Sequence, residues 1–219
     1  MYFSRIEVIR GMQIAIVSDA QSRQEFVQEG ASLQEVLWFE KLEDVRQHES
    51  ADVVIDLLFE KNEARIEQLR ALLPRTIIVN SVEHSLESID PSFIRINGWP
   101  TFLKGALIEA SCLDDSKKSI VENVFQIFQK KVEWLPDEPG FVTPRVISMI
   151  INEAFLSLEE GVSSKEDINT AMRLGTNYPY GPFEWVEKIG PDKVRRLLHQ
   201  LSLSNPRYTP SRFIAEKAV

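Results

Sequence analysis

The stretch Ala51-Asp52-Val53-Val54-Ile55-Asp56-Leu57-Leu58-Phe59 decides the fold class of the first half of the chain. It is almost continuously apolar, as a strand buried on both faces of a parallel sheet must be. Helical spacing follows over Asn62–Leu73, where Pro74 ends it, and Thr76–Val79 is the next strand. A strand, a helix and a second strand in this order favour a parallel sheet covered by helices.

The same alternation continues on both sides of this unit. Upstream, we predict strands over Gln13–Val17 and Val36–Phe39, with a helix over Glu25–Glu29 that Gly30 ends. Downstream, Ala106–Ala110 is a further strand. The first half of the chain therefore has the pattern of an α/β domain.

From about residue 137 onward only helical patterns occur. Val146–Leu158 carries the wide apolar stripe of a helix that packs on one side. Further helix starts follow at the capping box Ser163–Glu166, at Gly181-Pro182 and at Pro191. We therefore predict an α/β domain over residues 1–136 and an all-α domain over residues 137–219.

Composition argues against several classes of partner. The chain has 25 Lys and Arg against 33 Asp and Glu, and this net charge of −8 argues against nucleic acid or an anionic membrane. Cys112 is the single cysteine, and no two histidines have metal-ligand spacing, so we expect no disulfide and no metal site. Met1–Arg5 lacks a signal-peptide pattern, and no apolar run approaches the ~20 residues that span a bilayer. We expect a soluble, cytoplasmic protein.

The helical half carries an ordered series of motifs. They are Asp137-Glu138-Pro139-Gly140-Phe141-Val142, Glu166–Met172 and Asn177-Tyr178-Pro179-Tyr180-Gly181-Pro182-Phe183-Glu184-Trp185, with Arg207–Ser211 near the end. This series closely resembles the C-terminal domain of the 3-hydroxyacyl-CoA dehydrogenase family. The resemblance implies a Rossmann-like, doubly wound first domain that binds NAD, and an all-α second domain that forms a dimer interface. It also implies oxidation of the 3-hydroxyl of an acyl-CoA.

The family's glycine turn is replaced in this chain. A dinucleotide turn needs glycines because the backbone must approach the pyrophosphate closely while a helix N-terminus points at it. The family has G-x-G-x-x-G after its first strand, whereas this chain has Ser18–Arg23, without a glycine. Asp19 also puts a negative charge near the place of the two phosphates. We therefore expect that standard NAD binding is lost, although the resemblance implies NAD as the cofactor.

The family's proton-transfer pair is altered too. Hydride transfer from an alcohol needs a base that takes the hydroxyl proton, and histidine has a suitable pKa. The family supplies this His in a G-x-H-F-F-N-P segment, to which Ile94–Pro100 corresponds here. By spacing, Asn97 or Ile96 takes the His position, and neither is a base at neutral pH. Glu109 matches the family's Glu that orients the His, so it is either a catalytic candidate or a strand-end carboxylate bonded to backbone N–H groups.

Other family positions are matched in part. Glu60 matches a Glu that lies beside the nicotinamide half of the cofactor, and Asn80 is matched in the loop after the following strand. The resemblance thus implies cofactor binding by Glu60 and Asn80, and substrate binding by Ser81. Pro144 stands where the family has a substrate-side Asn, which removes a side-chain donor.

A deletion also shortens the first domain. The family carries a long helical arm that contributes to gripping CoA. Only Glu40–Ser50 fills that interval here, which suffices for one short helix. Much of the expected CoA contact surface is therefore absent.

These departures leave three hypotheses. The first is a catalytically impaired homologue that acts as a binding or regulatory subunit, pairs with itself or a relative through the helical domain, and has acyl-CoA as a candidate ligand. The second is an active NAD-dependent dehydrogenase of a 3-hydroxyacyl-CoA or smaller 3-hydroxy acid, in which His84 is a relocated base. The third is a scaffold without CoA that uses only the dimer interface. The joint loss of the glycine turn, the His, the Asn and the arm favours the first.

Overall fold

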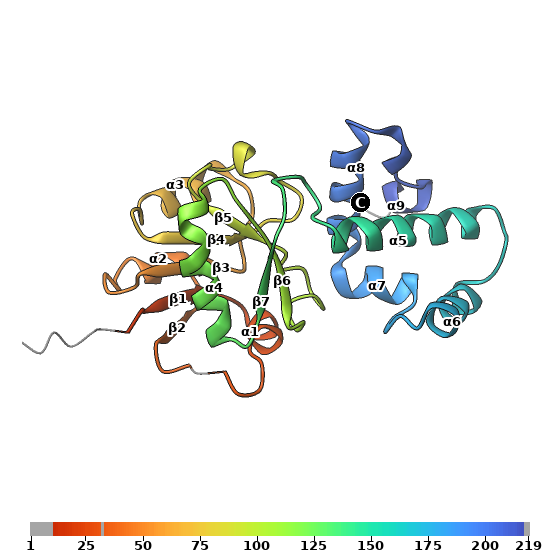
Figure 1. The fold of residues 1–219 in the computed structure, drawn as a ribbon. Coiled ribbons are helices and arrows are strands. Elements are labelled where there is room, and N and C mark those ends of the chain that lie inside the picture. The colour runs from red at the N-terminus through yellow and green to blue at the C-terminus, as the bar shows by residue number, and fades with distance from the viewer. Residues whose placement is uncertain (1–10, 32, 217–219) are drawn as a thin grey trace, which may run out of the picture.

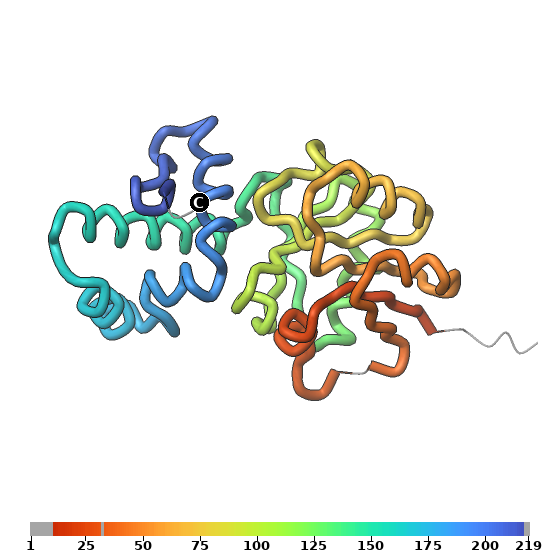
Figure 2. The backbone as a smooth tube through the Cα atoms, turned by 180° about the vertical axis from the view of Figure 1, so that it is seen from behind, coloured from red at the N-terminus to blue at the C-terminus, as the bar shows by residue number. Residues whose placement is uncertain are grey.

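The chain forms a sheet with helices on both faces, followed by a group of helices (Figure 1). The computed structural model describes residues 11–31 and 33–216, so Met1–Arg5 lies outside the described residues. Seen from behind in Figure 2, the same two parts lie side by side, joined by the segment that leaves the last strand. The boundary that the sequence predicts, between residues 136 and 137, falls in this segment.

The sheet has seven strands in the order β2-β1-β3-β4-β5-β6-β7 within the described residues. They are β1 (Ile14–Val17), β2 (Val36–Phe39), β3 (Val53–Asp56), β4 (Thr76–Asn80), β5 (Ile94–Ile96), β6 (Leu107–Cys112) and β7 (Lys131–Trp134). β1 pairs in parallel with both β2 and β3, so the chain leaves β1 in one direction and returns on its other side. This is a Rossmann-like fold, and its topological switch point lies between β1 and β3.

The last two strands give the sheet a mixed character. β6 pairs antiparallel with β5, and β7 pairs in parallel with β6, so both run against the first five strands. Residues 97–106 are the whole connection between β5 and β6. A parallel crossover needs about a dozen residues or more, usually including a helix, so this short connection reverses the chain instead.

Alternate residues of each strand face the two layers of helices. Ile14 and Ile16 point to the layer of α1 (Ala20–Phe26) and α4 (Lys118–Ile127). Ala15 and Val17 point to the opposite layer, which contains α2 (Leu42–Val45), α3 (Glu63–Arg70) and the 3-10 helix η1 (Leu86–Ser88). One helix of a single turn, α2, lies in the interval Glu40–Ser50, where the sequence predicts one short helix.

The second part is all helical and has its own core. Its elements are α5 (Thr143–Glu159), α6 (Lys165–Thr176), α7 (Pro182–Ile189), α8 (Pro191–Ser202), η3 (Pro206–Tyr208) and α9 (Arg212–Glu216), while the remaining short helix, η2 (Asp115–Lys117), precedes α4. Val82 and Trp99 from the sheet part are buried in this helical core. Among the described residues, no helix combines the length and apolar character needed to cross a bilayer.

A buried guanidinium fixes the segment that joins the two parts. Arg95 on β5 is fully buried, forms an ion pair with Asp137 and donates to the carbonyl of Glu138. Its guanidinium also lies 4.0 Å from the ring centroid of Phe141. The Asp137 carboxylate accepts a second hydrogen bond, 2.8 Å long, from the backbone N–H of Leu86. The path of the chain into α5 is therefore set by polar contacts with the sheet.

Candidate functional site

A cavity of about 460 Å³ opens at the carboxyl ends of β1, β3 and β4 and is closed on one side by α8. Ligands of open α/β sheets bind at this kind of place, outside the strand ends at a topological switch point. Four of the site residues predicted from the sequence line the cavity, namely Glu60, Asn80, Ser81 and His84. Glu109 lines a separate hollow beside Asn97 and Thr143, so the structure does not bring it together with the other four.

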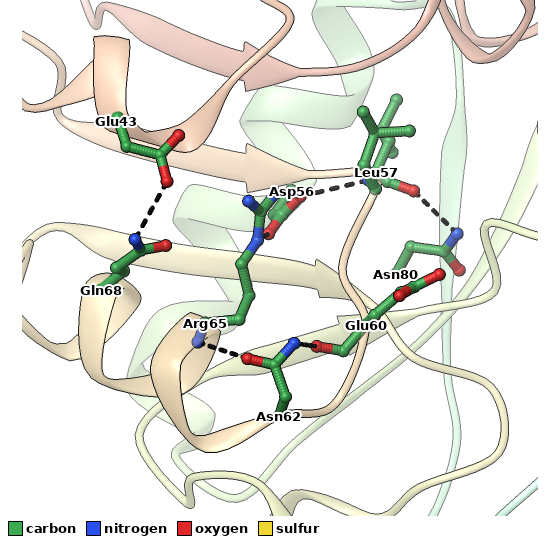
Figure 3. A network of polar contacts seen from close by, with 9 residues as sticks. Glu43, Asp56, Leu57, Glu60, Asn62, Arg65, Gln68 and Asn80 are labelled. Carbon is green, nitrogen blue, oxygen red and sulfur yellow. Dashed lines mark hydrogen bonds and ion pairs between the residues drawn. The ribbon is translucent and has the colours of Figure 1, made fainter.

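The loop that carries Glu60 is held by a polar network (Figure 3). Asp56, at the end of β3, is fully buried and accepts two hydrogen bonds of 2.8 Å from the Arg65 guanidinium of α3. Asn62 accepts from the backbone N–H of Arg65 at 2.8 Å and donates to the carbonyl of Glu60 at 3.3 Å. Glu60 is therefore placed at the cavity by contacts of its backbone and neighbours.

Asn80 joins three loops at the floor of the cavity. Its Nδ2 donates to the carbonyls of Leu57 and Gly98, both at 3.0 Å, and its Oδ1 accepts from the backbone N–H of Gly98 at 2.9 Å. A Cβ atom at position 98 would lie 2.5 Å from Cγ of Asn80, so this close approach requires glycine. Both amide hydrogens of Asn80 are thus used within the chain, and only acceptor capacity remains.

Ser81 and His84 lie on the loop after β4. Ser81 is buried, and its hydroxyl donates to the carbonyl of His84 at 3.3 Å. Burial, with the positive charges of Lys61 and Arg196 in addition, lowers the pKa of His84 to about 4. The imidazole is therefore neutral at pH 7, and it is a weak base there.

Of the two residues that could take the family's His position, Asn97 is the one that contacts Glu109. Its Nδ2 donates to Oε2 of Glu109 at 2.9 Å. The other carboxylate oxygen accepts from the backbone N–H groups of Val142 and Thr143, at 3.2 and 2.9 Å, and from the Thr143 hydroxyl at 3.0 Å. The Glu109 carboxylate is thus bonded to the first turn of α5, where Pro144 needs no partner because it has no N–H.

The N-terminal end of α1 is occupied by a side chain of the chain itself. Asp19 is the N-cap residue, and its carboxylate accepts from the backbone N–H of Ser22 at 2.7 Å. Nearby, the guanidinium of Arg23 lies 4.7 Å from the ring centroid of Trp38. A pyrophosphate placed here would lose a backbone donor and would face a carboxylate. The residues at this end of β1 do not fit a dinucleotide.

Comparison with known proteins decides the family. Residues 140–218 match the model of the "3-hydroxyacyl-CoA dehydrogenase, C-terminal domain". A 3-hydroxybutyryl-CoA dehydrogenase of Bradyrhizobium diazoefficiens is 30% identical over 196 residues, which cover 82% of this chain and 66% of that protein. The chain belongs to the 3-hydroxyacyl-CoA dehydrogenase family.

Other members of the family show how much of their length is shared. The 3-hydroxyadipyl-CoA dehydrogenase of Escherichia coli is 44% identical over 92 residues, which are 41% of this chain and 19% of that protein. The human mitochondrial hydroxyacyl-coenzyme A dehydrogenase is 41% identical over 78 residues, and the chain spans 25% of its length. This chain also superposes on the crystal structure of (S)-3-hydroxybutyryl-CoA dehydrogenase from Ralstonia eutropha, with a TM-score of 0.69 and 26% sequence identity. The superposition covers 84% of this chain and 70% of the Ralstonia chain.

Two further residues of this family member line the cavity, and sequence reasoning does not identify them. Lys193 and Arg196 lie one turn apart on α8 and face the loops of the sheet. Their spacing in the sequence indicates a shared helix face. It does not show that this face closes a cavity whose other lining residues, between Asp19 and Leu103, come far earlier in the chain. Among the described residues, no group of His, Cys, Asp and Glu side chains is arranged to hold a metal ion.

Proposed function

We propose that this member of the 3-hydroxyacyl-CoA dehydrogenase family is impaired in hydride transfer and acts as a binding or regulatory subunit. The observation that carries the proposal is the contact between Asn97 and Glu109 at 2.9 Å. An amide takes the place at which the family uses an imidazole. Neither nitrogen nor oxygen of an amide accepts a proton at neutral pH, so Asn97 supplies no base for the substrate hydroxyl.

The partners of Glu109 support the same proposal. Its carboxylate accepts four hydrogen bonds, from Asn97, from two backbone N–H groups and from the Thr143 hydroxyl. It is also only 5% exposed, so solvent has little access to these bonds. A carboxylate saturated in this way is well placed to stabilise the start of α5, and it has little freedom to orient a catalytic group.

The region around Asp19 supports impaired cofactor binding. Members of this family are NAD-dependent dehydrogenases. The phosphates of NAD need backbone N–H donors at the N-terminus of the first helix. Here the Asp19 carboxylate takes the amide of Ser22 at 2.7 Å. Asn80, the second candidate for contact with the cofactor, has both amide hydrogens bonded to backbone carbonyls.

The helical part supports a role in subunit pairing. α6 has no buried residue within a single chain, and Leu174 on this helix is 83% exposed. A helix with an amphipathic pattern gains its stability by packing an apolar face against something else. A second copy of the chain, or an active relative of the family, would supply that surface, and acyl-CoA is the ligand that the relatives' names suggest.

The second hypothesis, an active dehydrogenase with His84 as base, draws support from one observation. His84 lines the same cavity as Glu60, Asn80 and Ser81. A pKa of about 4 makes the imidazole a poor acceptor for the proton of an alcohol, however, and lowers the rate that it could support.

A turnover assay with NADH and acetoacetyl-CoA tests the proposal. We expect no oxidation of NADH above background for the wild-type chain, with the Bradyrhizobium diazoefficiens relative as positive control. The Asn97→His variant should stay inactive, because the altered turn around Asp19 is a separate defect. Turnover near the ~1–10³ s⁻¹ of ordinary enzymes would contradict the proposal. If such turnover then disappears in His84→Asn, the second hypothesis is the correct one.

A further inference from the structure

The charges that line the cavity come from both parts of the chain and differ in sign. The sheet part contributes the carboxylates of Asp19, Glu25, Glu60 and Glu83 together with Lys61, and α8 contributes Lys193 and Arg196. A cavity lined by a mixture of carboxylates and cations favours neither a polyphosphate nor a simple polyamine. A ligand that carries both a negative and a positive charge suits such a lining better than a ligand with charges of one sign only.

Most of these charges already have partners within the chain. The Asp19 carboxylate bonds to the amide of Ser22, and Glu25 accepts from the backbone N–H of Thr101 at 2.6 Å. Arg196 and Glu83 form an ion pair at 3.4 Å. These groups shape the cavity, and they have less capacity left for a ligand.

Three of the lining charges, those of Lys193, Glu60 and Lys61, are different. Among the described residues, the Lys193 ammonium has neither a hydrogen bond nor a carboxylate within 4.0 Å, and the Glu60 carboxylate has no such partner either. Lys193 is half-buried, and burial lowers its pKa below the usual range even though Glu83, Asp19 and Glu60 act in the opposite direction. It also lies in the first turn of α8, where the helix dipole disfavours a cation. In the described part of the chain, no direct contact of the ammonium offsets these two costs.

Lys193 and Glu60 line the same cavity from different parts of the chain. Glu60 belongs to the loop between β3 and α3 (Figure 3), and Lys193 belongs to α8 in the helical part. They are close enough to influence each other electrostatically and too far apart to form an ion pair. A small molecule with a carboxylate at one end and an ammonium at the other would bridge them, with one charged contact at each end.

We propose that this cavity binds a small zwitterion of the amino-acid class, with its carboxylate on Lys193 and its ammonium on Glu60. A volume of about 460 Å³ lies within the ~300–1,000 Å³ of small-molecule sites. The inference rests on the proposed function, because a bound dinucleotide would fill the same place. A zwitterion held in this way would connect the sheet to α8, and so would link ligand binding to the arrangement of the two parts.

Calorimetric titration with ligands of matched size tests the inference. We expect 4-aminobutanoate to bind saturably, and butanoate, glutarate and 1,4-diaminobutane to bind at least tenfold more weakly. Equal or tighter binding of glutarate or butanoate would show an anion site, and equal or tighter binding of the diamine would show a cation site; either would overturn the inference. It also fails if 4-aminobutanoate does not bind at millimolar concentration.

Single substitutions locate the binding. Lys193→Met and Glu60→Gln should each weaken 4-aminobutanoate binding about tenfold or more, since a charged hydrogen bond is lost. Lys188→Met, on α7 and outside the cavity, is the matched control and should leave binding unchanged. Equal affinity of the wild type and Lys193→Met would overturn the assignment of the carboxylate end.

Competition with NADH separates this inference from the proposed function. If NADH binds and displaces 4-aminobutanoate, a dinucleotide occupies the cavity and the proposed function fails. If neither molecule binds, the proposed function stands and only the zwitterion site is wrong.

Discussion

At position 97 an amide contacts the Glu109 carboxylate, where the resemblance implies an imidazole, and an amide is not a base at neutral pH. Asn97 also accepts from the backbone N–H of Trp99 at 3.3 Å, and its own N–H bonds to the carbonyl of Glu109 at 2.9 Å. Trp99 is buried in the helical core. Asn97 is therefore part of the contact between the two parts of the chain, a role that needs no proton transfer.

His84 gives a pH-dependent prediction. Its folded-state pKa of about 4 lies below the ordinary 6.5, so the unfolded chain binds more protons between pH 6.5 and pH 4. The stability that His84 contributes is thus fully present above pH 6.5 and is lost as the pH falls toward 4. An NMR titration of the imidazole resonances, assigned with His84→Asn, should show a midpoint near 4. A midpoint near 6.5 would mean that the imidazole is solvated and open to an incoming proton.

Arg95 gives a prediction of stability. In Arg95→Met the Asp137 carboxylate, 9% exposed, is left without its cation. Removal of one partner of a buried pair costs about 3–5 kcal/mol, and we expect a loss of this size in the free energy of unfolding in urea. Arg212→Met is the control, because the Arg212 side chain is 70% exposed, and it should change stability by no more than about 0.5 kcal/mol. A loss below about 1 kcal/mol in Arg95→Met would show that the pair does not hold the linker.

At the scale of elements, α5 begins where the Glu109 carboxylate of β6 reaches its first amides. Glu109→Ala removes the acceptor of two backbone N–H groups and of the Thr143 hydroxyl. We expect a loss of about 2 kcal/mol in unfolding free energy, and faster hydrogen exchange of the amides at 142 and 143. Glu153→Ala, an exposed position on the same helix, should show neither effect. Unchanged exchange at 142 and 143 in Glu109→Ala would contradict this structural role.

The sequence predicts the elements of this fold well where their pattern is strong. β3 is buried throughout, as its apolar run indicates, and α5 carries the expected stripe. β5 escapes prediction because it has three residues and lies in the segment Ile94–Pro100, which is matched only to the family's His-bearing motif. β7 is missed because Lys131 and Glu133 are exposed on an edge strand, so its apolar signal is halved.

The candidate site is less predictable than the fold. Resemblance places Glu60, Asn80, Ser81 and His84 near one another because they follow β3 and β4, whose carboxyl ends share one edge of the sheet. It does not predict that both amide hydrogens of Asn80 are donated to backbone carbonyls, because the residues that carry these carbonyls lie in loops that follow other strands. The sequence does not predict that Lys193 lines the cavity, because the position of this residue depends on how α8 packs against the sheet part.

At the scale of the molecule, α6 carries a large apolar side chain, Leu174, that one chain leaves uncovered. Leu174 is 83% exposed there, and we expect the chain to sediment as a dimer at micromolar concentration. Leu174→Glu should shift it toward monomer without loss of helical circular dichroism, because no intrachain core contains this side chain. Leu203→Glu, at the end of α8 and 71% exposed, is the control. A wild-type monomer, or equal effects of the two variants, would contradict pairing through α6.

Dinucleotide binding is predicted to fail at the carboxyl end of β1, where the Asp19 carboxylate caps α1. Calorimetric titration of the purified chain with NADH tests this claim most directly, with a dehydrogenase of the family titrated in parallel. We predict no saturable heat up to millimolar NADH. Micromolar binding, equivalent to about −8 kcal/mol, would show that the altered turn still accepts a dinucleotide and would contradict the account.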